Sequence, residues 1–365
     1  MRFDFTEDHR LFRENLRAFL EDECTPESLR SLWATETGRS RELWAKLAEV
    51  GLLGVLVPED HGGLGLGEVD LVLLLEEAGR VALPDPVVET AAVGAPLLRD
   101  SGSSLAAEWL PRIASGEAIL AIAHPRSPVV SDAHVAGLIV VADESAIHAV
   151  PRDRVKLTAQ PASDLSRRLF TIDAASTTSK DGLLASGADA RKLLGAALDR
   201  GALAVAAQQL GLAQRMVEIA VAYARQREQF GKPIGSFQAV KHMLSSVQVK
   251  IEFARPLVYR AAHSVAHPES RGEAARGVDV SLANAAASEA ALAAARTALQ
   301  VHGAIGYTWE VDLHIWMKRA WALESAWGSA SWHRRRVGAA VVDGDGPAPS
   351  FGFAANVRSS ASSAS

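Results

Sequence analysis

Two arginines and an aromatic ring lie close together in residues 223–238, which read YARQREQFGKPIGSFQ. The segment combines the end of a helix, a turn bounded by glycines and the start of a second helix. An arginine at a helix end suits a diphosphate, and Phe230, three residues after Arg227, suits a flat heteroaromatic ring. A solvated cluster of charges at a turn explains the same spacing equally well. The residues alone therefore indicate either a nucleotide contact or an ordinary polar turn.

Residues 300–308, QVHGAIGYT, form a second candidate site. Gln300 ends a predicted helix, and Gly303 and Gly306 permit a positive φ and a close approach of the backbone to a ligand. A glycine that simply stops a helix is the alternative. Residues 62–67, GGLGLG, predict a structural turn instead of a phosphate loop, because no Gly-Lys-Ser/Thr follows them and no clear strand precedes them.

The charge pattern and the cysteine count exclude several classes of function. The 365 residues hold 43 acidic and 38 basic side chains, mixed along the chain, so no basic face predicts binding to nucleic acid. Cys24 is the single cysteine, which rules out an intrachain disulfide and a thiolate metal cluster, and we expect no metal site. Residues 1–7 form no signal-peptide core, and no run approaches the ~18 apolar residues of a membrane span. We therefore expect a cytoplasmic protein.

Hydrophobic periodicity predicts the elements that must position the candidate residues, in a mainly α fold with a small β insert. Apolar residues at spacings of three and four predict an N-terminal helical domain over residues 1–115. Short β-branched runs predict a reduced middle β domain over residues 116–182. Long alanine-rich segments predict a C-terminal four-helix bundle over residues 183–341, and the polar residues 342–365 predict a disordered tail.

Local signals mark several element boundaries. Thr25 before a proline, and Ser40 before the run RELW, predict two helix starts. A further helix is predicted over residues 68–80, after the glycine turn. The predicted strands lie at 137–142, 146–150, 155–158 and 168–172, the first two as a hairpin. The predicted bundle helices lie at 193–227, 236–262, 276–301 and 313–340.

The same motifs occur together, in this order, in acyl-CoA dehydrogenases, which the chain resembles over residues 3–340. The resemblance rests on the segments VPEDHGGLG, YARQREQFGKPI and QVHGAIGY. It implies FAD as the cofactor, an acyl-CoA substrate and a bundle that drives oligomerisation. It also implies that Arg227, Phe230, Gln300 and Gly303 reach the adenine and diphosphate of an FAD bound to a neighbouring subunit.

The catalytic base of the family is missing from both positions where the resemblance places it. In these enzymes a glutamate removes the α-proton of the acyl thioester while a hydride leaves the β-carbon for the flavin. Trp327 stands at the usual position of this base, and Gly201 stands at the alternative one. Glu324 and Asp199 are carboxylates nearby in sequence, and Glu324 is the fallback candidate. A tryptophan at the base position is expected to fill the acyl cavity.

The β insert also departs from the family. Members usually carry a threonine-glutamate-proline run and then a glycine-serine-aspartate run, which hold the isoalloxazine. Here the two runs are Ala123-His124-Pro125 and Val130-Ser131-Asp132. We interpret His124 as a structural residue that forms hydrogen bonds.

Motifs that serve a neighbour's FAD are therefore kept, while the chain's own base and flavin cradle are degraded. This pattern resembles the base-lacking subunit of actinobacterial α2β2 acyl-CoA dehydrogenases, which act in sterol side-chain degradation. We expect one half of a heterotetramer whose catalytic partner supplies the base, with electron-transfer flavoprotein as the acceptor. Two alternatives stay open: a self-sufficient homo-oligomeric dehydrogenase of an acyl-CoA or acyl-carrier thioester with a relocated base, and a non-catalytic scaffold.

Overall fold

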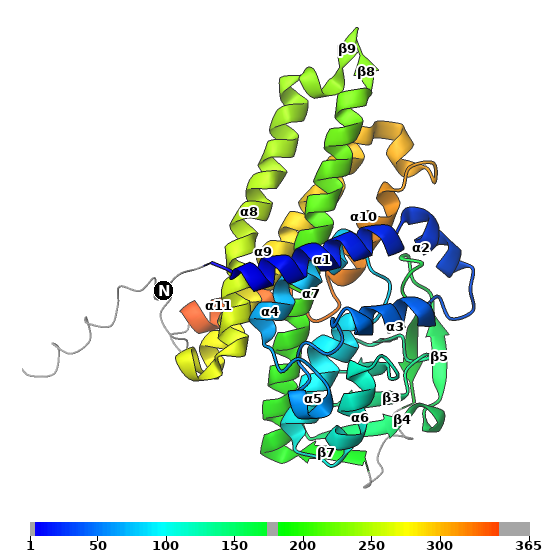
Figure 1. Cartoon of the computed structure of the whole chain (residues 1–365). Helices are drawn as coiled ribbons and strands as arrows, with labels where there is room; N and C mark the ends of the chain where they lie inside the picture. The colour runs from blue at the N-terminus through cyan, green and yellow to red at the C-terminus, as the bar shows by residue number, and fades with distance from the viewer. Residues whose placement is uncertain (1–3, 174–181, 343–365) are drawn as a thin grey trace, which may run out of the picture.

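The computed structural model describes residues 4–173 and 182–342. It has the mainly α architecture with a small β insert that the sequence predicts (Figure 1). The N-terminal helices cross the middle of a long helical bundle, and the β domain lies beside them. One end of the bundle extends away from the rest and carries a short hairpin, β8 (Glu228–Gln229) and β9 (Lys232–Pro233). The domain boundaries stay predictions, and the predicted tail lies outside the described residues from position 343 onward.

The N-terminal helices begin where their capping residues predict. The Thr25 hydroxyl accepts a hydrogen bond from the Ser28 amide at 3.2 Å, and the Ser40 hydroxyl accepts one from the Leu43 amide at 3.1 Å. Each satisfies an amide that has no partner inside its helix, which confirms both predicted starts. The elements are α1 (Glu7–Glu23), α2 (Pro26–Trp33), α3 (Arg41–Glu49), the 3-10 turn η1 (Glu59–His61), α4 (Glu68–Arg80), the π-helical η2 (Val88–Gly94), α5 (Ala95–Ser101) and α6 (Leu105–Ala114).

The glycine-rich residues 62–67 form a tight turn against the preceding segment. A Cβ atom at Gly63 would lie 2.1 Å from the Val57 carbonyl oxygen, so only glycine fits there. The Gly65 amide donates to the same Val57 oxygen at 2.8 Å. These contacts give the segment the structural role that its sequence predicts.

The β domain consists of two small sheets. The first has the order β1-β3-β4-β7 and the second the order β2-β6-β5. Strands β3 and β4 pair antiparallel across a turn in which Asp143 accepts from the Ser145 and Ala146 amides, which confirms the predicted hairpin. The prediction missed β1, β2 and β7. Strands β1 (LAIA) and β7 (LLAS) consist mostly of leucine and alanine, which favour helices, and β2 has only two residues. The bounds are β1 (Leu120–Ala123), β2 (Val130–Ser131), β3 (Leu138–Ala142), β4 (Ala146–Pro151), the 3-10 turn η3 (Arg152–Arg154), β5 (Leu157–Gln160), β6 (Leu169–Ile172) and β7 (Leu183–Ser186).

The bundle contains three long helices and two shorter ones. The prediction of one helix over residues 313–340 is wrong, because Gly328 has a φ of 106° and interrupts it. Trp327 lies in this break. The elements are α7 (Gly187–Gln226), the 3-10 turn η6 (Ile234–Ser236), α8 (Gln238–Ala266), α9 (Pro268–His302), the 3-10 turn η7 (Gly303–Tyr307), α10 (Leu313–Leu323) and α11 (Ala330–Val342).

Helices α4 and α7 cross at a pair of glycines. A Cβ atom at Gly79 would lie 2.0 Å from the Gln208 carbonyl oxygen, and one at Gly211 would lie 1.9 Å from the Glu76 oxygen. The two backbones therefore approach more closely than any larger residue would permit. This contact fixes the N-terminal helices against the bundle.

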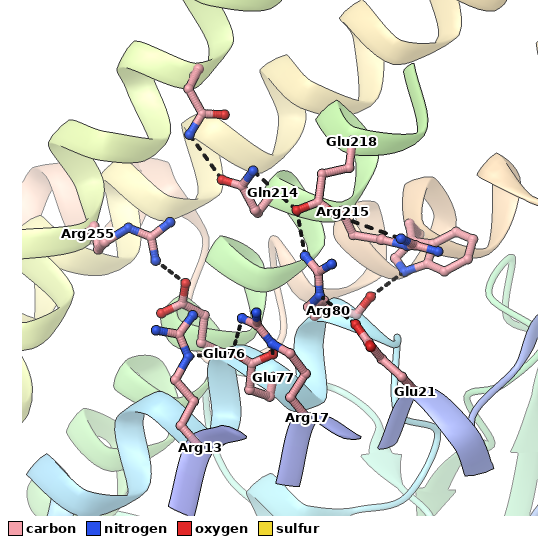
Figure 2. A network of polar contacts seen from close by, with 12 residues as sticks. Arg13, Arg17, Glu21, Glu76, Glu77, Arg80, Gln214, Arg215, Glu218 and Arg255 are labelled. Carbon is pink, nitrogen blue, oxygen red and sulfur yellow. Dashed lines mark hydrogen bonds and ion pairs between the residues drawn. The ribbon is translucent and has the colours of Figure 1, made fainter. Parts of the chain in front are cut away.

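A network of charged side chains surrounds this crossing (Figure 2). Glu77 is 1% exposed and accepts hydrogen bonds from Arg13 and Arg17, each at 2.6 Å. Burial alone would raise the pKa of Glu77, but the two guanidinium groups outweigh it and lower that pKa. Arg80 bonds Glu218 of α7 at 2.6 Å. Ion pairs thus join α1, α4 and α7 where the glycines bring them together.

Candidate functional site

The predicted nucleotide motif lies at the extended end of the bundle. Arg227 ends α7, where its amide donates to the Tyr223 oxygen at 2.8 Å, and its side chain is exposed. Phe230 has a φ of 53° in the turn of the β8–β9 hairpin and is 92% exposed. A positive φ is uncommon for an aromatic residue, so the turn holds this ring outside the chain's own core. Both side chains are free to contact another molecule.

The second motif lies at the same end. Gln300 is exposed near the end of α9, and Gly303 follows it with a φ of 65° and open space on its Cα. The Tyr223 and His302 rings stack with their centroids 4.3 Å apart, which joins the end of α7 to the end of α9. The fold thus brings both motifs to one end of the bundle. A guanidinium, an exposed ring and an unhindered glycine backbone suit the diphosphate and adenine of a dinucleotide.

The two candidate base positions are direct neighbours. Trp327 is 2% exposed in the break between α10 and α11. A Cβ atom at Gly201 of α7 would lie 2.1 Å from Cδ2 of this indole. The ring therefore occupies the space into which any side chain at position 201 would project. The two positions are 126 residues apart in the sequence, and only the fold shows that the Trp327 side chain occupies the space at both.

The His124 ring, from the β domain, packs against the Trp327 indole. The two rings lie parallel, with centroids 4.1 Å apart and an angle of 8° between the planes. Burial, with a smaller contribution from Arg126, lowers the pKa of His124 to about 4, so the imidazole is neutral at pH 7. The Arg126 amide lies 3.3 Å from its Nδ1. These contacts support the structural interpretation of His124.

The cavity beside Trp327 is small and polar. Its volume is about 30 Å³, which holds one or two water molecules, whereas small-molecule sites usually offer ~300–1,000 Å³. Its lining includes the acidic residues Asp85, Glu89 and Asp132. The prediction that Trp327 leaves no acyl-sized space is therefore consistent with the structure.

Asp85 is a buried acid of this cavity with a shifted pKa. It is 5% exposed, and neither carboxylate oxygen has a hydrogen-bond partner among the described residues. Burial raises its pKa to about 7, opposed in part by Arg39 and Arg319. Burial of the carboxyl group also raises the pKa of Glu89. Neither residue was predicted as part of a site, because nothing in the local sequence marks Asp85 as buried or Glu89 as lining a cavity.

Three arginines tie the parts of the molecule together around this cavity. Arg39, from the loop before α3, pairs with Asp132 of the β domain at 2.5 Å. Arg319 of α10 pairs with Asp164 and donates to the Leu83 oxygen at 2.6 Å. Arg167 donates to the Ser131 hydroxyl at 2.7 Å and to the Ala322 oxygen at 3.1 Å. In place of an acyl site, the cavity is a junction of the three parts of the fold.

The two carboxylates near the base positions have structural roles. Glu324 is half-buried and accepts from the Ala330 amide at 3.2 Å, at the first residue of α11. Asp199 is 1% exposed and pairs with Arg276 at 2.8 Å and with Arg336 at 2.6 Å. The geometry therefore lends no support to either as a base, and the catalytic role of Glu324 stays a prediction.

Two further expectations concern metals and membranes. Within residues 4–173 and 182–342, no group of His, Cys, Asp and Glu side chains is arranged to hold a metal ion. No helix in these residues has the length and apolar character needed to cross a bilayer.

Two protein-family models match the two helical parts of the chain. The model of the acyl-CoA dehydrogenase N-terminal domain covers residues 6–117, and that of the C-terminal domain covers residues 191–342. The chain is similar to acyl-CoA dehydrogenase IpdE2 of Mycolicibacterium smegmatis, with 34% identity over 92% of this chain and 99% of the relative. It is also similar to IpdE2 of Mycobacterium tuberculosis, with 32% identity over 86% of this chain and 91% of the relative.

Solved structures have the same fold. A chain in the ChsE4-ChsE5 complex of Mycobacterium tuberculosis matches with a TM-score of 0.82 and 29% identity, over 93% of this chain and 98% of that chain. A chain in a variant of the Tcur3481-Tcur3483 steroid ACAD matches with a TM-score of 0.81 and 26% identity, over 93% of this chain and 99% of that chain. Both matches span the helical parts and the β domain between them.

Proposed function

The chain belongs to the acyl-CoA dehydrogenase family of FAD-dependent enzymes, and we propose that it is the base-lacking subunit of a heteromeric dehydrogenase. One observation carries this proposal. The Trp327 indole lies where a side chain at Gly201 would project, so a single residue fills both places where the family keeps its base. A chain with neither base position available needs another chain to remove the α-proton.

The residues of this chain fit one part of FAD and not the other. The exposed Arg227, Phe230 and Gln300 suit a diphosphate and an adenine presented by a neighbour, with Gly303 open beside them. The chain's own β domain offers no room for an isoalloxazine beside Trp327, because that cavity measures about 30 Å³. We infer that this chain holds the adenine end of a cofactor whose flavin ring lies in the partner's cradle.

This fit gives the two subunits different roles. When bound, FAD accepts the hydride from the β-carbon of the acyl thioester. This chain orients the cofactor through Arg227 and the end of α9, while the partner removes the α-proton with its own carboxylate. The buried His124–Trp327 stack keeps substrate out of this chain's half.

The named relatives support a heteromeric assembly and a polycyclic substrate class. One solved relative is described as a complex of two different chains, and another as a steroid ACAD. We propose an α2β2 assembly that acts on an acyl-CoA with a steroid-derived acyl group. Electron-transfer flavoprotein is the proposed acceptor.

A flavin spectrum tests the proposal. The chain is purified alone, and again after co-expression with the dehydrogenase encoded by the adjacent gene, and each sample is mixed with acyl-CoA. Yellow protein that bleaches only in the co-expressed pair is the expected result. Bleaching by the chain alone would establish a self-sufficient enzyme, with Glu324→Gln as the next variant. A complex without flavin would instead indicate a scaffold.

A further inference from the structure

A second cavity lies at the opposite end of α7 from the β8–β9 hairpin (Figure 1). Its volume is about 550 Å³, within the ~300–1,000 Å³ usual for small-molecule sites. Its walls come from the end of α5, from β7, from the first turns of α7 and from the connection between α8 and α9. Arg200 in this lining and Arg227 are about 40 Å apart along α7, at ~1.5 Å per residue. We call this cavity the α5–α9 pocket.

Two largely buried arginines line the α5–α9 pocket. The side chains of Arg200 and Arg276 are each 11% exposed. Arg200 donates from Nε to Glu68 at 2.7 Å and from Nη1 to Asp100 at 2.9 Å. Arg276 donates from Nε to Asp199 at 2.8 Å. These contacts hold both guanidinium groups in place, so little conformational entropy would be lost when a ligand binds to them.

Three donor atoms of these arginines are available to a ligand. Within residues 4–173 and 182–342, Nη2 of Arg200 and both terminal nitrogens of Arg276 make no hydrogen bond. None of the three is buried without a partner, so solvent reaches them. The Asp199 carboxylate also accepts from Arg336 at 2.6 Å, so one buried acid serves two arginines and a positive charge is left over. Fixed guanidinium groups with free N–H donors and excess positive charge suit a carboxylate or a phosphate.

The rest of the lining decides between these two kinds of anion. Leu193 and Val265 supply apolar wall, which suits a hydrocarbon body. Asp189 and Glu273 also line the pocket, and both are exposed. The exposed Lys192 balances only one of these two negative charges. Their carboxylates repel a polyanion, such as a nucleotide diphosphate, more strongly than a monoanion. An apolar molecule with a single carboxylate therefore fits the whole lining.

We propose that the α5–α9 pocket binds an amphipathic monocarboxylate. Its carboxylate lies on the free donors of Arg200 and Arg276, and its apolar body lies along Leu193 and Val265. A guanidinium group can bind a carboxylate through two parallel N–H bonds, so Arg276 orients the head of the ligand. The inference goes beyond the proposed function, because none of the proposed FAD contacts lines this pocket.

Ligand-observed NMR titrations of the purified full chain test the inference. Octanoate is the probe, 1-octanol lacks its carboxylate, and ADP is a polyanion without its apolar chain. We expect saturable binding of octanoate, binding of 1-octanol that is ~10–100-fold weaker because the charged hydrogen bonds are lost, and no binding of ADP in the pocket. Arg276→Leu removes the donors, and Ala196→Leu fills the pocket while keeping its charges. Each variant should weaken octanoate binding at least tenfold.

Arg191→Leu is the matched control, because Arg191 is an exposed arginine of α7 that does not line the pocket, and it should change octanoate binding less than threefold. Melting curves followed by circular dichroism show which variants fold, and Ala196→Leu decides if Arg276→Leu does not. Three results would overturn the inference: no saturable octanoate binding, equal affinity for octanoate and 1-octanol, or octanoate binding within threefold of the wild type in Ala196→Leu. ADP binding that Ala196→Leu abolishes would identify a phosphate site and also overturn it. The proposed function stands in each case, because no flavin takes part.

Discussion

Adding one methyl group at Gly201 tests whether Trp327 fills the base site. In Gly201→Ala, the new Cβ would lie 2.1 Å from Cδ2 of Trp327, 2.2 Å from Cε3 and 2.7 Å from Cε2. The ring cannot retreat easily, because it is 2% exposed and stacks on His124 at 4.1 Å. Helix α7 must therefore shift, or the indole must leave its place.

The expected change in the free energy of unfolding of Gly201→Ala follows from two opposing effects. Overpacking a core costs ~1–3 kcal/mol, and a clash with three ring atoms lies at the upper end of this range. Replacing a helical glycine by alanine returns ~1 kcal/mol. The net loss of stability is thus ~2 kcal/mol, which lowers the melting temperature by about 3 °C if the chain unfolds as one unit with ~2.1 cal/mol/K per residue.

Gly195→Ala is the matched control. Gly195 lies on the same helix, and a Cβ atom there would meet nothing within 4 Å. This variant keeps the gain in helix propensity without the clash, so its melting temperature should rise slightly. Thermal unfolding followed by circular dichroism measures both variants.

A double-mutant cycle with Trp327→Ala separates the clash from other effects. Removing the indole costs ~3–5 kcal/mol, and in that background the methyl at position 201 has room and should stabilise by ~1 kcal/mol. The coupling between the two sites is then ~3 kcal/mol. If Gly201→Ala stabilises the wild type as much as Gly195→Ala does, the indole does not occupy the space at position 201 and the argument for a filled base site fails.

Three further variants probe the cavity, the cofactor contacts and the charged network. Asp85→Asn removes an acid whose pKa rises from 3.8 to about 7 on folding. The native state therefore loses stability as pH rises through this window, by up to ~4 kcal/mol, and the variant should exceed the wild type in melting temperature above pH 7 but not near pH 4. A difference that is independent of pH would contradict the assignment. Arg227→Ala should lower the affinity of the complex for FAD ~10–100-fold, because it removes a hydrogen bond from a charged donor. Arg225 is also exposed, and Arg225→Ala should leave this affinity unchanged. If FAD titrations give the same affinity for both variants, Arg227 does not contact FAD. Glu77→Gln leaves two arginines without their buried partner and should cost ~3–5 kcal/mol at pH 7. Because the pKa of Glu77 is lowered, this stabilisation exists above pH ~4.5 and disappears as pH falls, so melting curves that show the same deficit at pH 3 would refute it.

Local structure was predictable wherever neighbouring residues decide it. The Thr25 and Ser40 caps bond amides three residues away, so the sequence alone marks these helix starts. The turn at Asp143 is equally local. The prediction failed at the break before α11, because a glycine inside an alanine-rich pattern does not reveal whether its φ is positive.

By itself, the sequence determined the fold class and the family, since these depend on residue types and their order, and it predicted that neither base position holds a carboxylate. The tertiary structure alone decided how the two candidate base positions lie relative to each other. Gly201 and Trp327 come from different helical segments, and only packing shows that one fills the space beside the other. The same holds for Asp85, whose raised pKa depends on burial among residues from all three parts of the chain. Close packing and burial arise when segments distant in sequence come together in space, and no local pattern of residues encodes them.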